Sequence, residues 1–390
     1  MVVKNEKAIK SEETAATIER YFAEVEDPRS RINQEHKLVD ILVITICAVI
    51  CGADDWEAVA SFGRAKQSWL EGFLALPSGI PSHDTFWRVF RALDAEEFQR
   101  SFVKWMQALC RLKKGEIVAV DGKKLRRSFA KEDSKAAIHM VSAWASANGV
   151  VLGQRKVDDK SNEITAIPEL LRTLEIEGCI VTTDAMGCQT EIAQTILDQN
   201  ADYLLALKEN QPHLYEDVAL LFDDLEESGF RAYTYDEVTD VDKGHGRIEV
   251  RKAWVISDPD ILCHLRGFQR WPQLRSVVKI QSERYLPSGN SCEIRYFISS
   301  LDRPASAILH AVRTHWSIEN SCHWVLDIAF REDESRLRKD NGAQNFALLR
   351  HIALNALKQE SSLRIGIKNK RLRAGWDHDY LMKVLSAAFS

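Results

Sequence analysis

The sequence lacks the motifs of several common functional classes. Its eight cysteines are scattered without a CxxC pair, and Cys47 and Cys51, four positions apart in an apolar stretch, indicate core packing rather than a metal site. No glycine-rich loop follows any of the strands expected below, so the sequence gives no support to a P-loop or a dinucleotide-binding fold. A protein of a reducing compartment is therefore expected.

Long apolar runs are also missing. The most apolar stretch, from Ile41 to Ala53, is shorter than the roughly 20 residues that a membrane span needs, so it predicts a buried helix. Residues 1–30 are rich in Lys and Glu and contain no apolar segment of the kind that a signal peptide needs. We therefore expect a cytoplasmic protein that does not contact a membrane.

Acidic residues slightly outnumber basic residues, which gives a net charge of −5. The basic residues gather in two clusters, at 111–131 and 363–373. Local patches, more than net charge, attract phosphate, so both clusters are candidate nucleic-acid surfaces. A run of charge is equally typical of a solvated face. The second cluster consists of Arg364, Lys368, Lys370, Arg371 and Arg373.

The length of 390 residues predicts two or three domains. Apolar residues recur at helical spacing through residues 1–112, which predicts a helical N-terminal domain with possible DNA binding. Ser82 is placed to cap a short helix, and residues 82–91 resemble the second helix of a helix-turn-helix. The predicted divisions are 1–112, 113–229, 230–302 and 303–390.

The period of apolar residues changes at Gly115 from helical to strand-like. A short apolar run ends at Asp121, and two further runs flank Asn148-Gly149, which is a strong hairpin signal. A helix, strand 179–183, helix 190–198 and strand 203–207 follow. This order predicts an α/β fold, with a ribonuclease-H-like mixed-sheet catalytic core. Residues 230–302 contain strand-like runs separated by Gly, Pro and Ser, which predict a β-rich insertion in that core.

Three acidic residues stand where these elements would bring them together. Asp121 and Asp184 each close an apolar run, and Glu319 lies inside a helix-like segment. Mg²⁺ prefers carboxylate oxygens, and a pair of such ions suits phosphodiester chemistry. Each aspartate taken alone is also typical of a turn after a strand.

Longer motifs make a family resemblance specific. The chain resembles the H-repeat-associated transposases of bacterial insertion sequences, a branch of the DDE transposase superfamily. The motifs that carry the resemblance are Asp27-Pro28-Arg29, Ser82-His83-Asp84-Thr85-Phe86-Trp87-Arg88, Asp121-Gly122-Lys123, residues 160–168 (KSNEITAIP), Asp184-Ala185-Met186-Gly187-Cys188-Gln189, residues 207–211 (LKENQ), residues 244–249 (GHGRIE), residues 315–320 (HWSIEN), Trp324–Asp327 and Phe330–Asp333.

The resemblance implies a ribonuclease-H-like core with a β insertion before the third acid. It also implies that Asp121, Asp184 and Glu319 are the catalytic acids and bind Mg²⁺ or Mn²⁺. The implied partner is double-stranded DNA, as terminal inverted repeats and target, with a homodimer in the synaptic complex. Related transposases carry Tyr, Arg and Lys around the last acid, where this chain has Val312, His315 and Leu326. Arg313 and Arg350 are the nearest basic substitutes.

Seven residues are candidate DNA contacts because of their charge and their expected place near the acids or in the insertion. These are Lys123, Arg126, Lys208, His245, Arg247, Arg313 and His315. For the residues in strands, a salt bridge across the sheet is an equally good interpretation.

Two other functions remain open on the sequence. His315, Glu319 and His323 are spaced four apart and would share a helix face, which allows a zinc hydrolase, although no HExxH motif is present. The second function is that of a decayed transposase that survives as a DNA-binding protein. The acids that compete for the metal are Asp158, Asp159, Asp327, Glu332 and Asp333.

Overall fold

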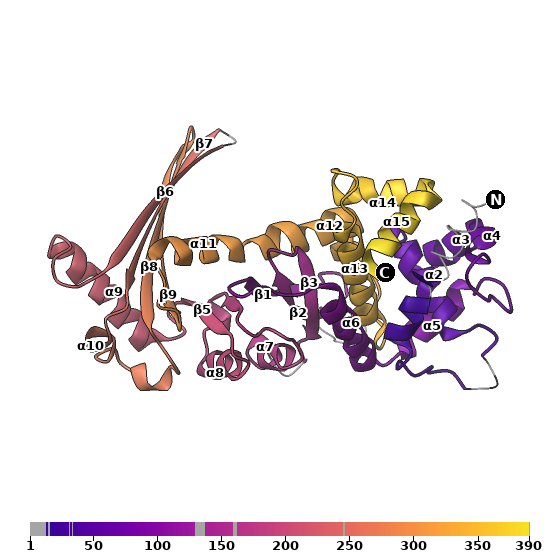
Figure 1. Cartoon of the computed structure of the whole chain (residues 1–390), viewed down its shortest axis with the longest axis horizontal. Helices are drawn as coiled ribbons and strands as arrows, with labels where there is room; N and C mark the ends of the chain where they lie inside the picture. The colour runs from indigo at the N-terminus through magenta and orange to yellow at the C-terminus, as the bar shows by residue number, and fades with distance from the viewer. Residues whose placement is uncertain are drawn as a thin grey trace.

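The computed structural model describes residues 13–389, except for 15, 31, 33, 129–136, 159–161 and 245. The molecule is long, with a β ribbon at one end, a sheet flanked by helices in the middle and a helical body at the other end (Figure 1). Within the described residues, we find no helix whose length and apolar character would let it cross a membrane.

The described N-terminal residues are helical, as predicted. The helices are α2 (Leu38–Ile50), α3 (Trp56–Ala65), α4 (Gln67–Leu70), α5 (His83–Ala92) and α6 (Ala95–Leu109). Ser82 caps α5 by accepting a hydrogen bond from Thr85 N at 3.3 Å, which confirms the predicted cap. However, α4 and a loop separate α5 from α3, whereas a helix-turn-helix joins its helices by about three or four residues. The predicted motif is therefore wrong for this pair.

The last helices of the chain complete the same helical body. They are α12 (Trp324–Phe330), α13 (Gly342–Gln359), α14 (Ile367–Trp376) and α15 (His378–Phe389). Helix α11 (Ala305–His315) precedes them and packs on the sheet. Helix α13 is buried along most of its length and contacts α2, α5, α6 and α15, because apolar residues cover nearly all of its faces. The helical body thus draws on both ends of the chain and packs through α6 and α13 against the sheet.

Nine strands form one mixed sheet in the order β3-β2-β1-β4-β5-β9-β8-β7-β6. The strands are β1 (Ile117–Lys124), β2 (His139–Ala145), β3 (Val150–Lys156), β4 (Ile180–Thr183), β5 (Asp202–Leu207), β6 (Asp236–Gly244), β7 (Arg247–Ile256), β8 (Ser276–Leu286) and β9 (Gly289–Ser299). Strands β1, β4 and β5 are parallel, and the other neighbours are antiparallel. The predicted hairpin is present between β2 and β3, with Gly149 at φ +66° in its turn.

Strands β6 to β9 extend the central sheet instead of forming a separate one. Strand β9 pairs with β5 from Leu204–Ser299 to Leu207–Tyr296, so the predicted insertion continues the same hydrogen-bonded layer. Its far end projects as the ribbon in Figure 1. Helices α7 (Glu163–Leu171), α8 (Thr190–Asp198), α9 (Pro212–Glu227) and α10 (Pro259–Leu262) connect the strands.

Helix α11 brings the chain back from the insertion to the central strands. It contacts β6 and β7 and then β1 and β4, and it runs toward α12 and α13 in Figure 1. Its buried residues, among them Ile308, Leu309 and Val312, pack with Val255, Val278 and Phe297 of the insertion strands. The residues after α11 are thereby returned to the carboxyl ends of β1 and β4.

Candidate active site

Asp121 and Asp184 lie beside each other on neighbouring parallel strands. Val120 of β1 is in register with Thr183 of β4, so Asp121 and Asp184 occupy the next position on each strand. Neighbouring strands lie roughly 4.8 Å apart. Strand β1 continues to Lys124, so Asp121 is inside the strand and not at its end as the sequence suggested. Asp184 caps the short helical turn Ala185–Gly187 by accepting from Gly187 N at 3.2 Å.

Glu319 begins a π-helical segment, Glu319–His323, between α11 and α12. Such segments are rare and are found mainly at functional sites. Glu319 is exposed, whereas Cys322 of the same turn is buried against the core.

The charges of Asp184 and Glu319 both act on Asp121. Burial and the negative charges of Asp184, Glu163 and Glu319 together raise the pKa of Asp121 to about 7, against a hydrogen bond from the Gly122 backbone that lowers it. The pKa of Asp184 is also raised, first by burial and then by Glu163, while Lys208 lowers it. Partly buried carboxylates that repel one another are the donor set that a hard divalent cation would stabilise.

The carboxylates fit Mg²⁺ better than the histidines fit Zn²⁺. Over the described ranges, no three His, Cys, Asp or Glu side chains are arranged to hold a metal ion by themselves. Zinc usually takes three or four protein ligands, whereas Mg²⁺ is usually held by one or two carboxylates, with waters and substrate phosphates completing its shell. His315 Nδ1 lies instead 2.9 Å from Thr182 Oγ1.

Both histidines near Glu319 are partly buried. Burial lowers the pKa of His315 and of His323 to about 4, so both are neutral at pH 7. His323 Nδ1 lies 3.5 Å from an oxygen of Asp121. His315 also lines the cavity beside Asp184 and Lys208, so its contact with DNA stays a prediction.

The side chain of Lys123 is also committed within the protein. Its ammonium contacts Asp327, lies 2.8 Å from Glu332 Oε2, and is only 10% exposed. Arg350 lies behind this group, 3.7 Å from Glu332. The predicted phosphate contact by Lys123 is therefore replaced by an internal ion-pair cluster of Lys123, Asp327, Glu332 and Arg350. Asp327 and Glu332, two of the acids that compete for the metal, are both paired with Lys123.

The remaining candidate contacts differ in how accessible they are. Arg126 is largely exposed and pairs with Asp333, and Lys208 lines the cavities beside Asp184. Arg313 is 2.7 Å from Asp240, and Arg247 is 2.9 Å from Glu249 of its own strand. A salt bridge across the sheet is present at Glu249, whose carboxylate also lies 3.4 Å from Arg284 of β8. His245 lies outside the described residues.

The second basic cluster divides into exposed and buried members. Lys370 Nζ donates to Leu357 O at 2.9 Å, and Arg371 Nη2 donates to Val49 O at 2.8 Å. Both side chains are buried, so they fix α14 to the helical body and are not available to DNA. Only Arg364, Lys368 and Arg373 keep the predicted surface position.

Sequence reasoning missed two features of the site. Glu163, the first residue of α7, lies close enough to influence both aspartates, and it pairs with His139. Arg295 of β9 lines three adjoining cavities, one with Glu319 and two with Asp184, and its guanidinium stacks over Trp316 at 4.7 Å. Arg295 is distant in sequence from all three acids, so no motif spacing connects it to them.

An arginine-lined groove leads to Glu319. It encloses about 440 Å³ between α11 and the insertion strands. The arginines that line it are Arg247, Arg251, Arg284, Arg295 and Arg313. Each of these arginines pairs with a carboxylate of Glu249, Glu293 or Asp240.

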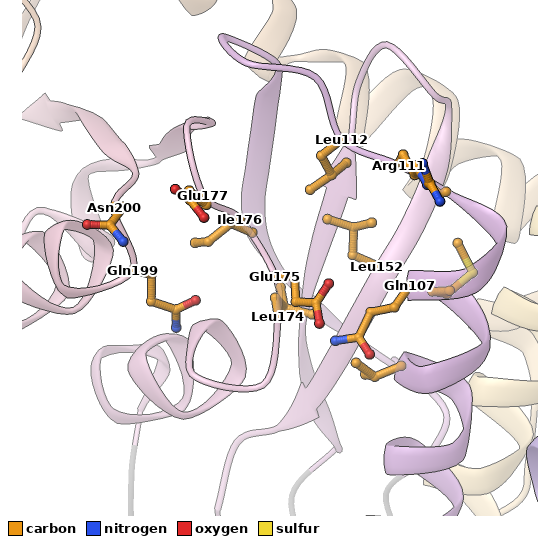
Figure 2. A pocket seen from close by; sticks show the side chains of 13 residues that line it. Gln107, Arg111, Leu112, Leu152, Leu174, Glu175, Ile176, Glu177, Gln199 and Asn200 are labelled. Carbon is orange, nitrogen blue, oxygen red and sulfur yellow. The ribbon is translucent and has the colours of Figure 1, made fainter.

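A separate pocket lies at the other end of the strands. Figure 2 shows Arg111, Glu175, Glu177 and Asn200 around this space of about 580 Å³, in segments that precede β1, β4 and β5. Asp121 lies in the second half of β1, Asp184 follows β4 and Glu319 follows α11, so this pocket is not part of their site.

Known proteins resemble the chain along most of its length. Residues 112–356 match the family described as transposase DDE domain, and residues 19–106 match the family described as DDE_Tnp_1-associated. A putative transposase YncI from Escherichia coli O157:H7 is 41% identical over 94% of this chain and 94% of its own length. The H repeat-associated putative transposase YhhI from Escherichia coli K12 is 39% identical over 93% of this chain and 96% of its own. An inactive transposase YbfQ from the same strain is 50% identical over 14% of this chain and 64% of its own length.

Proposed function

The chain belongs to the DDE transposase family, in its H-repeat-associated branch, and we propose that it cleaves and joins the DNA ends of a bacterial insertion sequence. The observation that carries the proposal is the convergence of Asp121, Asp184 and Glu319 at one edge of the sheet. The register of β1 with β4 and the return of α11 account for that convergence.

The proposed core is ribonuclease-H-like. This is supported by the order β3-β2-β1-β4-β5, with β2 antiparallel to β1 and with β4 and β5 parallel to it. The proposed domains are 1–112, 113–229, 230–302 and 303–390. The end of the first family match at 106 and the start of the second at 112 support the first boundary.

Asp121, Asp184 and Glu319 are the proposed holders of Mg²⁺ or Mn²⁺. When bound, a pair of such ions activates the attacking oxygen and stabilises the leaving oxygen of a phosphodiester. Neutral His323 packs against Asp121 and limits how far that carboxylate is hydrated. The arginines of the groove would hold the DNA backbone beside Glu319.

The proposed partner is double-stranded DNA, as terminal inverted repeats and as target. Because an element has two ends, we expect two copies of the chain to act together in the synaptic complex. The proposed place of action is the bacterial cytoplasm, where that DNA lies.

The test is cleavage of DNA that carries the element's ends. Changing Asp121, Asp184 or Glu319 singly to Ala should abolish Mg²⁺- or Mn²⁺-dependent cleavage and leave end binding intact. Ca²⁺ should support little cleavage, because its coordination is longer and looser. Asp158, exposed beyond β3, is the matched control, and its change to Ala should leave cleavage unchanged.

Three results would count against the proposal. Cleavage that survives the loss of any one of the three acids would remove that residue from the site. Equal collapse on changing His315 or His323 to Gln, with rescue by Zn²⁺ and not by Mg²⁺, would favour the zinc hydrolase. End binding by the unaltered chain without any cleavage would instead favour the decayed transposase, a state that the name of the relative YbfQ shows to occur in this family.

A further inference from the structure

Glu163 is held against the strand that carries Asp121. It is the first residue of α7, and Asn162 caps that helix by accepting from Ile164 N at 3.0 Å. Helix α7 contacts β2, β3 and the turn Ala185–Gly187 that Asp184 caps. Helix α7 is therefore fixed against the hairpin next to β1 and against the turn that follows β4.

The contact with β1 is so close that any side chain at position 122 would have to displace Glu163 and His139. A β-carbon there would overlap Oε1 of Glu163 and would lie 2.6 Å from Nε2 of His139. His139 Nε2 itself lies 2.8 Å from Glu163 Oε1, and both side chains are mostly buried. Gly122 thus provides the space in which a carboxylate–imidazole pair sits next to Asp121.

Glu163 also influences both aspartates through its charge. It raises the pKa of Asp184 more than any other charged residue does, and it raises the pKa of Asp121 more than Glu319 does. Glu163 therefore belongs to the same electrostatic group as the three acids, although it lies on a different element.

We propose that Glu163 is a fourth acid of the catalytic site, that it strengthens cation binding by Asp121 and Asp184, and that His139 is the positioning residue that orients it. This inference rests on the proposed function. The simpler interpretation, a structural ion pair that ties β2 to α7, requires no effect of Glu163 on the binding of a cation.

The two interpretations differ in what the isosteric change Glu163→Gln does to the DNA-free protein. The amide keeps the shape and a hydrogen bond to His139 but removes the charge. We expect Mn²⁺ affinity, measured by titration calorimetry on the full chain, to fall about tenfold or more, since nearby charges in a protein remain coupled at an effective dielectric constant near 20. Cleavage should fall at low Mn²⁺ and recover substantially at high Mn²⁺.

Glu169→Gln is the matched control. It removes a carboxylate from the same helix, where Glu169 pairs with Arg155 at 2.8 Å, away from the aspartates. Its Mn²⁺ affinity should equal that of the unaltered chain. His139→Gln should weaken Mn²⁺ binding less than Glu163→Gln, because the charge of Glu163 remains.

Unchanged Mn²⁺ affinity in Glu163→Gln, with unchanged dependence of cleavage on Mn²⁺, would overturn the inference. If that variant melts early, Glu163→Ala gives the same test without a buried amide. Asp121→Asn, measured in parallel, separates this inference from the proposed function. If Asp121→Asn loses cleavage while Glu163→Gln binds Mn²⁺ normally, only the role of Glu163 as a fourth acid is rejected. If Asp121→Asn keeps cleavage, the proposed function is rejected.

Discussion

Replacing Lys123 with Met should destabilise the protein by about 3 kcal/mol at pH 7, in the lower part of the range for a broken buried ion pair. Lys123 is the closest positive charge to Glu332, whose side chain is 2% exposed, and it also contacts Asp327. Arg350 would remain, but its nearest nitrogen is 3.7 Å from Glu332. Methionine fills a similar volume, so the loss reports mainly on the charge.

The pKa of Glu332 gives a second route to the same magnitude. Burial alone would raise this pKa, but Lys123, Arg350 and His351 lower it from 4.5 to about 2. A carboxyl whose pKa is lowered on folding contributes stability above its unfolded pKa and loses it as the pH falls through its folded pKa. The difference corresponds to about 3 kcal/mol, since one pKa unit is about 1.4 kcal/mol.

The loss in Lys123→Met should therefore depend on pH. It should be full at pH 7 and shrink as the pH falls, because the unpaired Glu332 of the variant takes up a proton earlier than the paired Glu332 of the unaltered chain. Urea unfolding followed by tryptophan fluorescence from pH 7 to pH 3 measures both quantities.

Lys124→Met is the control, because Lys124 is the exposed neighbour at the end of the same strand. The double variant Lys123→Met/Glu332→Gln should recover part of the lost stability. A loss below about 1 kcal/mol, or one that is the same at every pH, would show that the cluster does not hold the buried charge as argued.

Three further predictions follow from the same structure. The exposed members of the second basic cluster are Arg364, Lys368 and Arg373. Changing these to Ala should weaken DNA binding. The slope of the logarithm of the binding constant against the logarithm of the salt concentration should become shallower by about 0.9 for each lost phosphate contact. An unchanged slope would mean that the cluster is only a solvated face. Arg371→Met should instead lower stability by about 3 kcal/mol in urea unfolding, because its guanidinium is buried on Val49 O and near Asp54, and normal stability would contradict this. Gly122→Ala should abolish cleavage, whereas Gly244→Ala, with open space around its β-carbon, should not; equal activity of both would refute the close approach of Glu163.

The elements around the site were predictable because their signals are local. Apolar runs and the Asn148-Gly149 turn predict β1 to β5 and the hairpin within a few residues of their observed bounds. The pairing of β5 with β9 was not predictable, because it joins residues almost a hundred positions apart and depends on no short motif. Helix α14 was also missed, because its buried positions are occupied mainly by Lys370 and Arg371.

The burial of charged residues was the least predictable property. Basic residues in a run look alike in the sequence, yet Lys123 and Arg371 are enclosed while Lys124 and Arg373 are exposed. What separates them is whether a carboxylate or a carbonyl from a distant element meets the side chain. Glu163 was quoted within a family motif but assigned no function, because its relation to Asp121 arises only when α7 packs against β1.

The tripeptide Asp121-Gly122-Lys123 shows how one strand organises the whole site. Side chains alternate along a strand, so Asp121 and Lys123 point to one face and position 122 to the other. On the first face, Asp121 meets His323, the last residue of the segment that Glu319 begins, and Lys123 meets Asp327 of the following helix α12. On the second face, the missing side chain admits Glu163 from α7. Lys123 therefore fixes the position of the third acid relative to the first, and Gly122 fixes that of Glu163. A change at either position should disturb the arrangement of the carboxylates while leaving all of them present.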